Sequence, residues 1–257
     1  MQLFYRKYGE GQPLLILHGL FGISDNWVNF GKKLAEQGFE VYILDQRNHG
    51  QSPHSPNFNY LALVDDLFEF IDEHELDEPI ILGHSMGGKV AMRFALENPN
   101  YISKLIVVDI SLRQYPPRDY HKKVIAAMQK MNFSNVKRRE EVDAVLAEAI
   151  DSVRVRQFIM KNLYRNEKGE FAWRLCISAI ANNIDFMFDG IEAASPFLKP
   201  TLLVRGALSD YVLDSDLPDF QNAFPALLLH TIPNASHWVH AEEPELFYSY
   251  VIDFLKA

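Results

Sequence analysis

Ser85 stands in the setting that best suits a serine to covalent chemistry. It is the centre of residues 83–87, which read G-H-S-M-G and match the pattern G-x-S-x-G. The apolar run 79–82 precedes the motif, and a helical pattern follows it until Pro99. Strand, sharp turn and helix are the setting of a nucleophile elbow. We therefore expect Ser85 to lie clear of a sheet at the positive end of a helix, where developing negative charge is stabilised.

A serine hydroxyl attacks well only when a base takes its proton, and histidine often serves as that base. In chains with this kind of elbow the order is nucleophile, acid and then histidine, so the base should follow the last strand. His237 comes soon after the apolar run 227–232, and His240 follows it closely. The position in the loop favours His237 as the base and leaves His240 as the rival.

The acid that would orient this base has two candidates. Asp210 follows the penultimate strand pattern, which is the commoner position for the acid. Asp109 follows the strand pattern 105–108, and its loop should lie next to the elbow. Either carboxylate would fix the tautomer of the imidazole and stabilise its charged form. The residues alone leave both candidates open.

An acyl-transfer site also needs N–H groups that hold an oxyanion. One is the backbone N–H of the residue after the nucleophile, Met86, and the other comes from the loop after an early strand. Here that loop is residues 18–22, H-G-L-F-G, directly after the apolar run 14–17. Its glycines allow a tight turn. We expect Leu20 to be the second donor, with Phe21 as the alternative.

The elements that must position these residues follow a simple alternation. Up to Val108, and again after residue 197, short apolar runs alternate with amphipathic helical patterns. Near-continuous apolar strands separated by helices predict a mostly parallel sheet with helices on both faces. The expected strands are 3–8, 14–17, 41–44, 80–82, 105–108, 201–204 and 227–232, and the expected helices are 27–37, 60–74, the one after Ser85, and 246–255.

The pattern changes between residues 112 and 197. This segment shows no convincing buried strand, and its helical stretches are 120–131, 138–150, 153–163 and 177–188. We therefore predict an α/β core at 1–111 and 198–257 that is interrupted by a helical cap at 112–197. Such a cap should roof the nucleophile and shape a pocket. Its aromatic wall candidates are Tyr115, Tyr120, Phe133, Phe158, Phe171, Trp173, Phe186 and Phe188, whereas Phe21 and Trp238 are the better candidates to line the pocket.

The composition narrows the class of protein. The chain has 257 residues and a net charge of −9, with 34 acidic against 25 basic residues, which argues against nucleic acid or an anionic membrane surface as partner. The single cysteine, Cys176, excludes an internal disulfide and is consistent with a cytoplasmic location. No signal-peptide pattern appears at the N-terminus, and no run approaches the ~20 apolar residues of a membrane span. No spacing typical of metal ligands accompanies His237 and His240.

At this point the chain resembles the α/β-hydrolase superfamily over essentially its whole length. The landmarks are His18-Gly19, residues 45–52 (D-Q-R-N-H-G-Q-S), the motif 83–87, and His237. Finer details resemble the YbfF-like bacterial esterases and their mitochondrial relatives. These details are HGLFG followed by residues 24–26 (S-D-N), RNHG at 47–50, GHSMGGK, the D-I-S loop at 109–111, and HWVHAE at 237–242.

The resemblance implies a function and refines the choice of acid. It implies an α/β-hydrolase fold with an inserted helical cap, and a serine esterase or thioesterase that forms an acyl-enzyme on Ser85 without a metal or organic cofactor. In the subfamily the acid follows the earlier strand, which favours Asp109, and a serine near the later position matches Ser209. Asp210 beside that serine departs from the pattern and stays the alternate acid.

Other activities on the same fold stay open, because fold does not determine function. A serine at the elbow excludes, by resemblance, the dehalogenases and epoxide hydrolases, which need an aspartate there. Cofactor-free haloperoxidases, carbon–carbon bond hydrolases and aminopeptidases keep the serine. A ligand receptor that retains the three residues but turns over slowly is the alternative outside catalysis. We expect a small-molecule ester or thioester as the partner; its acyl length and the oligomeric state are not readable from the residues.

Overall fold

The central sheet is mostly parallel, as the alternation of apolar runs predicted. The computed structural model describes residues 1–117 and 119–257, and within them the sheet has seven strands in the order β1-β3-β2-β4-β5-β8-β9. Only the pairing of β1 with β3 is antiparallel. The strands are β1 (Tyr5–Tyr8), β2 (Gln12–Leu17), β3 (Phe39–Leu44), β4 (Ile80–His84), β5 (Leu105–Val108), β8 (Thr201–Gly206) and β9 (Leu227–Ile232).

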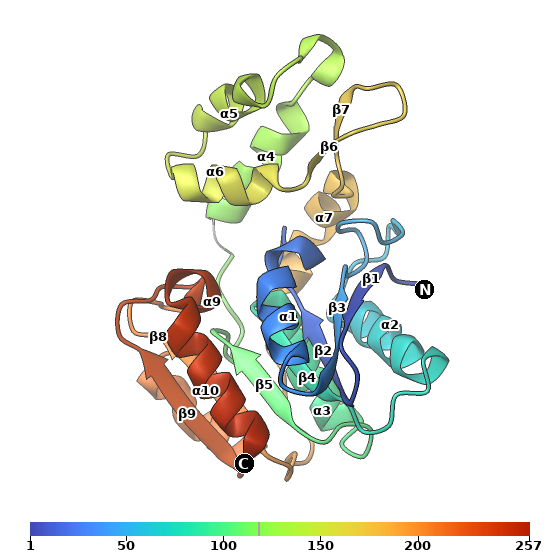
Figure 1. Cartoon of the computed structure of the whole chain (residues 1–257). Coiled ribbons are helices and arrows are strands. Elements are labelled where there is room, and N and C mark those ends of the chain that lie inside the picture. The colour runs from blue at the N-terminus through green and yellow to red at the C-terminus, as the bar shows by residue number, and fades with distance from the viewer. Residues whose placement is uncertain (118) are drawn as a thin grey trace.

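Helices cover both faces of this sheet (Figure 1). Side chains alternate across a strand, so in β2 Leu15 and Leu17 pack on one face and Leu14 and Ile16 on the other. The first face packs against α2, α3 and α8, and the second against α1 and α10. The bounds are α1 (Val28–Ala35), α2 (Tyr60–Glu73), α3 (Met86–Glu97), α8 (Leu217–Ala223), α9 (Val239–Glu242) and α10 (Pro244–Lys256).

The segment between β5 and β8 forms the upper lobe in Figure 1. It contains α4 (Asp119–Lys130), α5 (Arg139–Ala147), α6 (Val153–Met160), the strands β6 (Leu163–Arg165) and β7 (Phe171–Trp173), α7 (Ile177–Asn183) and a 3-10 helix at Ile184–Phe188. This lobe holds most of the predicted cap, 112–197, whose boundaries stay a prediction.

The hairpin of β6 and β7 was not predicted from the sequence. The helix expected at 153–163 ends at Met160, and Leu163 already belongs to β6. The turn that joins the strands explains the difference, because Asn166 Oδ1 accepts the N–H groups of Lys168 and Glu170 and Gly169 adopts φ 77°. Asparagine and glycine in such a turn favour a hairpin over a helix, and the strands on either side are too short to show an alternation.

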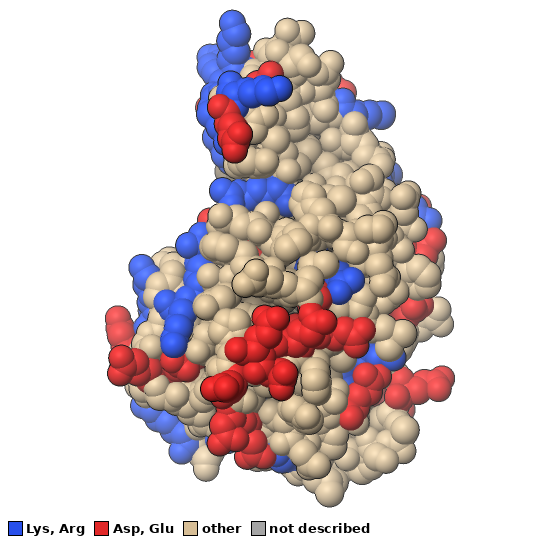
Figure 2. All heavy atoms as spheres, turned by 90° about the vertical axis from the view of Figure 1, so that its right-hand side faces the viewer, with Lys and Arg blue, Asp and Glu red and all other residues tan. Residues whose placement is uncertain are grey.

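The surface charge is unevenly spread. Figure 2 shows a band of Asp and Glu side chains across the face that carries α2, and Lys and Arg side chains toward the upper lobe. Exposed acids on α2 and in the loop after it are Asp65, Glu69, Asp72, Glu73, Glu75, Asp77 and Glu78. Of the helices in the described residues, none is long and apolar enough to cross a membrane.

Candidate active site

Ser85 lies in a strained turn between β4 and α3. Its φ is 53° and its ψ is −118°, a conformation that costs free energy in a residue with a Cβ. The turn is held by Ser85 N–H donating to Val108 O at 3.1 Å and by Lys89 N–H donating to Ser85 O at 3.0 Å. A Cβ at Gly87 would lie 2.4 Å from Leu17 O, so glycine is required there by the close approach of the neighbouring strand.

The carboxyl ends of the parallel strands bring the predicted residues together. Ser85 follows β4, Asp109 follows β5 and His237 comes after β9, and such ends share one edge of a parallel sheet. Ser85 Oγ–H donates to His237 Nε2 at 3.0 Å, and His237 Nδ1–H donates to Asp109 Oδ2 at 2.8 Å. The three side chains therefore form one continuous hydrogen-bonded series.

Asp109 is fully buried and accepts several hydrogen bonds. Besides His237, the N–H of Gly206 donates to its Oδ1 at 2.9 Å, and Ser209 Oγ donates to its Oδ2. Asp109 itself adopts φ 49°, so its turn is strained like that of the serine. Donors on both oxygens hold the carboxylate in one orientation, which an acid that orients a catalytic base requires.

The alternate acid, Asp210, lies elsewhere. It is exposed in the loop after β8, and its backbone carbonyl accepts a hydrogen bond of 2.8 Å from Arg113 Nη2. The carboxylate in contact with the imidazole of His237 is that of Asp109. Ser209, the residue before Asp210, reaches the same carboxylate from the later loop. The geometry therefore favours Asp109 over Asp210.

His240 packs away from the serine. Its ring stacks on Trp27 with centroids 4.0 Å apart and lies 4.9 Å from the ring of His84. Burial lowers the pKa of His240 to about 3. A neutral ring packed against an indole serves the core, so the geometry favours His237 over this rival.

Two residues that the sequence analysis did not assign hold His237 in place. Tyr211 stacks on the imidazole with ring centroids 3.9 Å apart and an interplanar angle of 20°. His84, the variable residue of the G-x-S-x-G motif, lies 2.9 Å through Nε2 from the backbone carbonyl of His237. Burial drives the pKa of His84 well below its usual value, so Nε2–H of the neutral ring donates this bond. The place of His84 inside the motif was the only sequence signal for this role.

The loop after β2 narrows the choice of oxyanion donors. The N–H of Phe21 donates to His49 Nε2 at 3.2 Å, and the carbonyl of Phe21 accepts 2.8 Å from Asn162 Nδ2. The N–H and the carbonyl of Phe21 therefore both have hydrogen-bond partners already. The backbone N–H of Leu20 is then the candidate to hold the oxyanion together with that of Met86. Leu20, Met86 and Ser85 line the same compartment.

The histidines of the HG and RNHG motifs, His18 and His49, brace this loop in their neutral forms. His49 Nδ1–H donates to Arg47 O at 2.9 Å while its Nε2 accepts from Phe21. His18 Nδ1–H donates to Gly19 O at 2.9 Å and its Nε2 accepts the Gln46 N–H at 3.0 Å. Burial lowers the pKa of His18 to about 4 and that of His49 to about 3. Protonation of either Nε2 would break the bond that it accepts.

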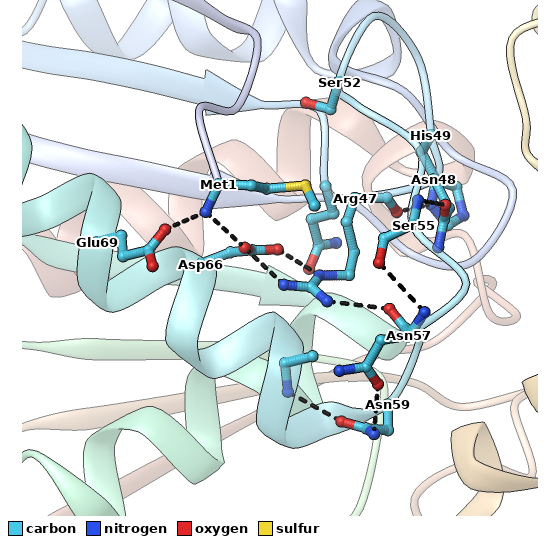
Figure 3. Close-up of polar contacts among 12 residues, drawn as sticks. Met1, Arg47, Asn48, His49, Ser52, Ser55, Asn57, Asn59, Asp66 and Glu69 are labelled. Carbon is cyan, nitrogen blue, oxygen red and sulfur yellow. Dashed lines mark hydrogen bonds and ion pairs between the residues drawn. The ribbon is translucent and has the colours of Figure 1, made fainter. Parts of the chain in front are cut away.

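A buried ion pair between Arg47 and Asp66 holds the RNHG loop, residues 47–50, against α2 (Figure 3). Arg47 reaches both carboxylate oxygens of Asp66 on α2, at 2.5 and 2.7 Å, and also the carbonyl of Asn57. The N-terminal ammonium of Met1 contacts Asp66 at 3.1 Å and also contacts Glu69. A bidentate arginine–carboxylate pair holds a specific geometry, so this network keeps the loop that carries His49 against α2.

The space above Ser85 divides into two compartments. The larger has a volume of about 200 Å³ and the smaller about 30 Å³. Both predicted lining residues, Phe21 and Trp238, lie in the larger compartment. Of the cap aromatics, Tyr120 and Phe158 line the larger compartment and Tyr115 and Phe188 the smaller, whereas Phe133, Phe171, Trp173 and Phe186 line neither of the two.

Comparison with known proteins identifies the family. The family model of the alpha/beta hydrolase fold matches residues 12–174. A solved structure of a marine microorganism esterase is 42% identical, with a TM-score of 0.95 over 99% of each chain. Esterase YbfF of Escherichia coli K12 is 31% identical over 92% of this chain and 90% of its own. The sn-1-specific diacylglycerol lipase ABHD11 of Danio rerio is 36% identical over 96% of this chain and 80% of its own.

These similarities extend over nearly the whole chain, so they include the loops that carry Ser85, Asp109 and His237. The chain belongs to the α/β-hydrolase fold family and is a hydrolase of the carboxylesterase type that resembles the YbfF-like esterases.

Proposed function

We propose that this protein hydrolyses carboxylic esters or acyl thioesters through an acyl-enzyme on Ser85. One observation carries the proposal: Ser85 Oγ, the imidazole of His237 and the carboxylate of Asp109 form a hydrogen-bonded series with bonds of 3.0 and 2.8 Å. That series opens onto an apolar cavity. A nucleophile, a base and an orienting acid in this arrangement are what acyl transfer needs.

The first step forms one covalent bond and breaks another. Ser85 Oγ attacks the carbonyl carbon while its proton passes to His237 Nε2, and the tetrahedral oxyanion is held by the Leu20 and Met86 amides. Collapse of this intermediate breaks the carbon–oxygen or carbon–sulfur bond, and the leaving group takes the proton from His237. Water then attacks the acyl-enzyme with His237 as base, and the acid product leaves as Ser85 regains its proton. No metal or organic cofactor enters either step.

The relatives support esters as the substrate class. Two of the similar proteins are named esterases, and the ABHD11 relative is named for diacylglycerol. Phe158, Ile159 and Trp238 are among the apolar residues that line the larger compartment. The role predicted for the cap, residues 112–197, as a roof over Ser85 is supported by α4 and α6, which contribute residues to this compartment.

The test is hydrolysis of p-nitrophenyl acetate by the wild type, by Ser85→Ala and by Ser134→Ala, an exposed serine of the upper lobe. We expect activity in the wild type and Ser134→Ala and none above background in Ser85→Ala. A reactive fluorophosphonate should label only the proteins that keep Ser85. A folded wild type that hydrolyses no ester or thioester, yet is thermally stabilised by one, would overturn the proposal in favour of a receptor.

A further inference from the structure

The two compartments meet at the serine and differ in what surrounds them. His237, Phe158 and Trp238 line the larger one, of about 200 Å³. The smaller, of about 30 Å³, is lined instead by Met86, Ile110, Met187 and Phe188. Leu20, Ser85, His121 and Tyr211 line both. An ester bound at Ser85 must place its acyl part in one compartment and its alcohol part in the other.

The position of His237 decides which part goes where. The leaving oxygen or sulfur receives its proton from His237 Nε2, so it has to lie on the imidazole side of the tetrahedral carbon. Of the described residues, His237 lines the larger compartment and is not among those that line the smaller. Met86, the proposed oxyanion donor, lines the smaller one. The alcohol or thiol therefore extends into the larger compartment and the acyl chain into the smaller.

Two tyrosines that line the smaller compartment are held by hydrogen bonds. Tyr60 O–H donates to Met187 O at 3.0 Å, and Tyr115 O–H donates to Tyr211 O at 2.6 Å while accepting from the Ser111 amide. Behind these two rings lies the ammonium of Lys89, 5.9 Å from the centroid of Tyr60 and 5.0 Å from that of Tyr115. Because both hydroxyls are engaged with backbone groups, the wall cannot turn aside without breaking hydrogen bonds.

Lys89 also contacts both linkers, the segments of chain that enter and leave the upper lobe. Its Nζ donates to the carbonyls of Arg113 and Asp189, which lie on the chain entering and leaving the lobe. The two linkers also pair directly, with Tyr115 N–H donating to Phe188 O and Ile191 N–H donating to Leu112 O, both at 2.8 Å. The linkers that carry the wall of the smaller compartment are thus held at several points, so its volume should change little when a substrate binds.

The volume then limits the acyl chain. A water molecule needs a cavity of roughly 10–15 Å³ on this measure, so about 30 Å³ holds roughly two groups of that size. The smaller compartment is lined by apolar side chains such as those of Ile110, Met187 and Phe188, and burying a charged acyl terminus against them would be costly. The acyl part that fits is short and uncharged.

We propose, building on the esterase function above, that the site selects esters or thioesters of acetyl- or propionyl-sized acids with a larger apolar alcohol or thiol. Selectivity comes from the smaller compartment and in particular from Met187 and Ile110. A long-chain acyl group does not fit in the smaller compartment, of about 30 Å³.

A pair of isomeric esters tests this directly. Hexyl acetate and ethyl hexanoate have the same composition and differ in which side of the carbonyl carries the long chain. We expect wild-type kcat/KM, measured by pH-stat titration, to be at least about tenfold higher for hexyl acetate, because a single excess methylene already costs about tenfold or more in a tight pocket. A smaller preference, or a preference for ethyl hexanoate, overturns the inference while leaving ester hydrolysis intact. Failure of both isomers and of p-nitrophenyl acetate would overturn the esterase function itself.

A matched pair of variants assigns the selectivity to the smaller compartment. Met187→Ala enlarges that compartment, and we expect it to raise the ratio of ethyl hexanoate to hexyl acetate hydrolysis by about tenfold. Phe158→Ala enlarges the other compartment and should lower kcat/KM for hexyl acetate without raising that for ethyl hexanoate. If Met187→Ala does not fold, Ile110→Val provides a milder enlargement with the same expected direction. An unchanged ratio in a folded Met187→Ala or Ile110→Val contradicts the assignment.

Discussion

The sheet core and the upper lobe contribute different things to the same site. Ser85, Asp109 and His237 all come from loops at one edge of the sheet, where a hydrogen bond to the backbone holds each of the three residues. The lobe contributes apolar side chains, such as Phe158 from α6 and Met187 and Phe188 from the chain leaving it. We infer that the sheet core positions the reacting groups and that the inserted lobe determines which substrate fits. Regular elements such as strands hold a precise geometry better than loops do.

The two regions also differ in charge. Residues 112–197 contain 14 Lys and Arg against 11 Asp and Glu, whereas the rest of the chain contains 11 against 23. Figure 2 shows the acidic part as the band over the face that carries α2. The lobe and the core therefore attract each other at long range in low salt, while buried hydrogen bonds such as the one from Asn162 to Phe21 determine how they fit.

The largest effect should come from removing the acid of the core. Asp109→Asn should lower kcat by about 10⁴-fold, because an amide cannot hold the imidazole in its productive tautomer. Asp210→Asn, one residue from Ser209 but exposed, should stay within about threefold of wild type, since it leaves the contact with His237 untouched. Steady-state hydrolysis of p-nitrophenyl acetate measures both. A large loss in Asp210→Asn alone would show that the acid assignment is wrong.

The next effect tests whether the lobe acts on the chemistry as well as on selectivity. Asn162→Ala removes the hydrogen bond from the lobe to the Phe21 carbonyl, and we expect kcat to fall by about 10- to 100-fold with a smaller change in KM, because the oxyanion loop shifts. Asn183→Ala is the matched control, since it also removes a hydrogen bond from the lobe to the core, at Pro56. Equal effects of the two variants would indicate that the lobe contributes only general stability.

A smaller effect concerns the acid sensitivity of the core. The pKa of His240 is lowered to about 3 by burial, so the folded form keeps this ring neutral while the unfolded chain protonates it below about 6.5. The unfolded state then binds more protons, and stability is lost as pH falls from about 6.5 toward 3. Its Nδ1 has no hydrogen-bond partner in the part of the chain that the structure describes, which makes a phenyl ring a tolerable replacement.

We expect His240→Phe to recover about 1.4 kcal/mol of the stability that the wild type loses between pH 7.5 and 5.5. Urea unfolding at the two pH values measures this difference. His54→Gln, at an exposed histidine, should show the same pH dependence as the wild type. Loss of esterase activity in a folded His240→Phe would instead indicate that His240, and not His237, is the catalytic base.

The smallest effect concerns Lys89 of α3, whose Nζ donates hydrogen bonds to the carbonyls of Arg113 and Asp189. Burial lowers the pKa of Lys89 to about 7, below its value in the unfolded chain, so between about pH 7 and 10.5 the unfolded state binds more protons and stability rises with pH. From pH 7 to 8 this gain is about 1 kcal/mol. Lys89→Met should remove it, whereas Lys104→Met, at a lysine that contacts the carbonyls of Phe254 and Leu255, should keep it. Identical slopes in urea unfolding would show that Lys89 does not titrate in this range.

Much of the fold was readable before the structure. The expected strand 227–232 has the observed bounds, and the expected helix 60–74 differs from α2 by one residue. These elements have long apolar periodicity, so local pattern is enough. The hairpin at 163–173 was missed because strands of three residues carry no such period, and the turn chemistry of Asn166 and Gly169 was the only available signal.

By itself, the sequence determined which residues were candidates: a serine between glycines after an apolar strand, a histidine after the last strand, and two aspartates. It did so because motifs and periodicities are local. Only the tertiary structure placed the carboxylate of Asp109 against the imidazole of His237, gave the Phe21 amide a partner in His49, and brought Asn162 to the Phe21 carbonyl. These contacts depend on strand order: β5 pairs with β4, so the turn after β5 lies beside the serine. No local pattern contains that information, because hydrogen-bonded partners such as Ser85 and His237 are separated by 152 residues along the chain.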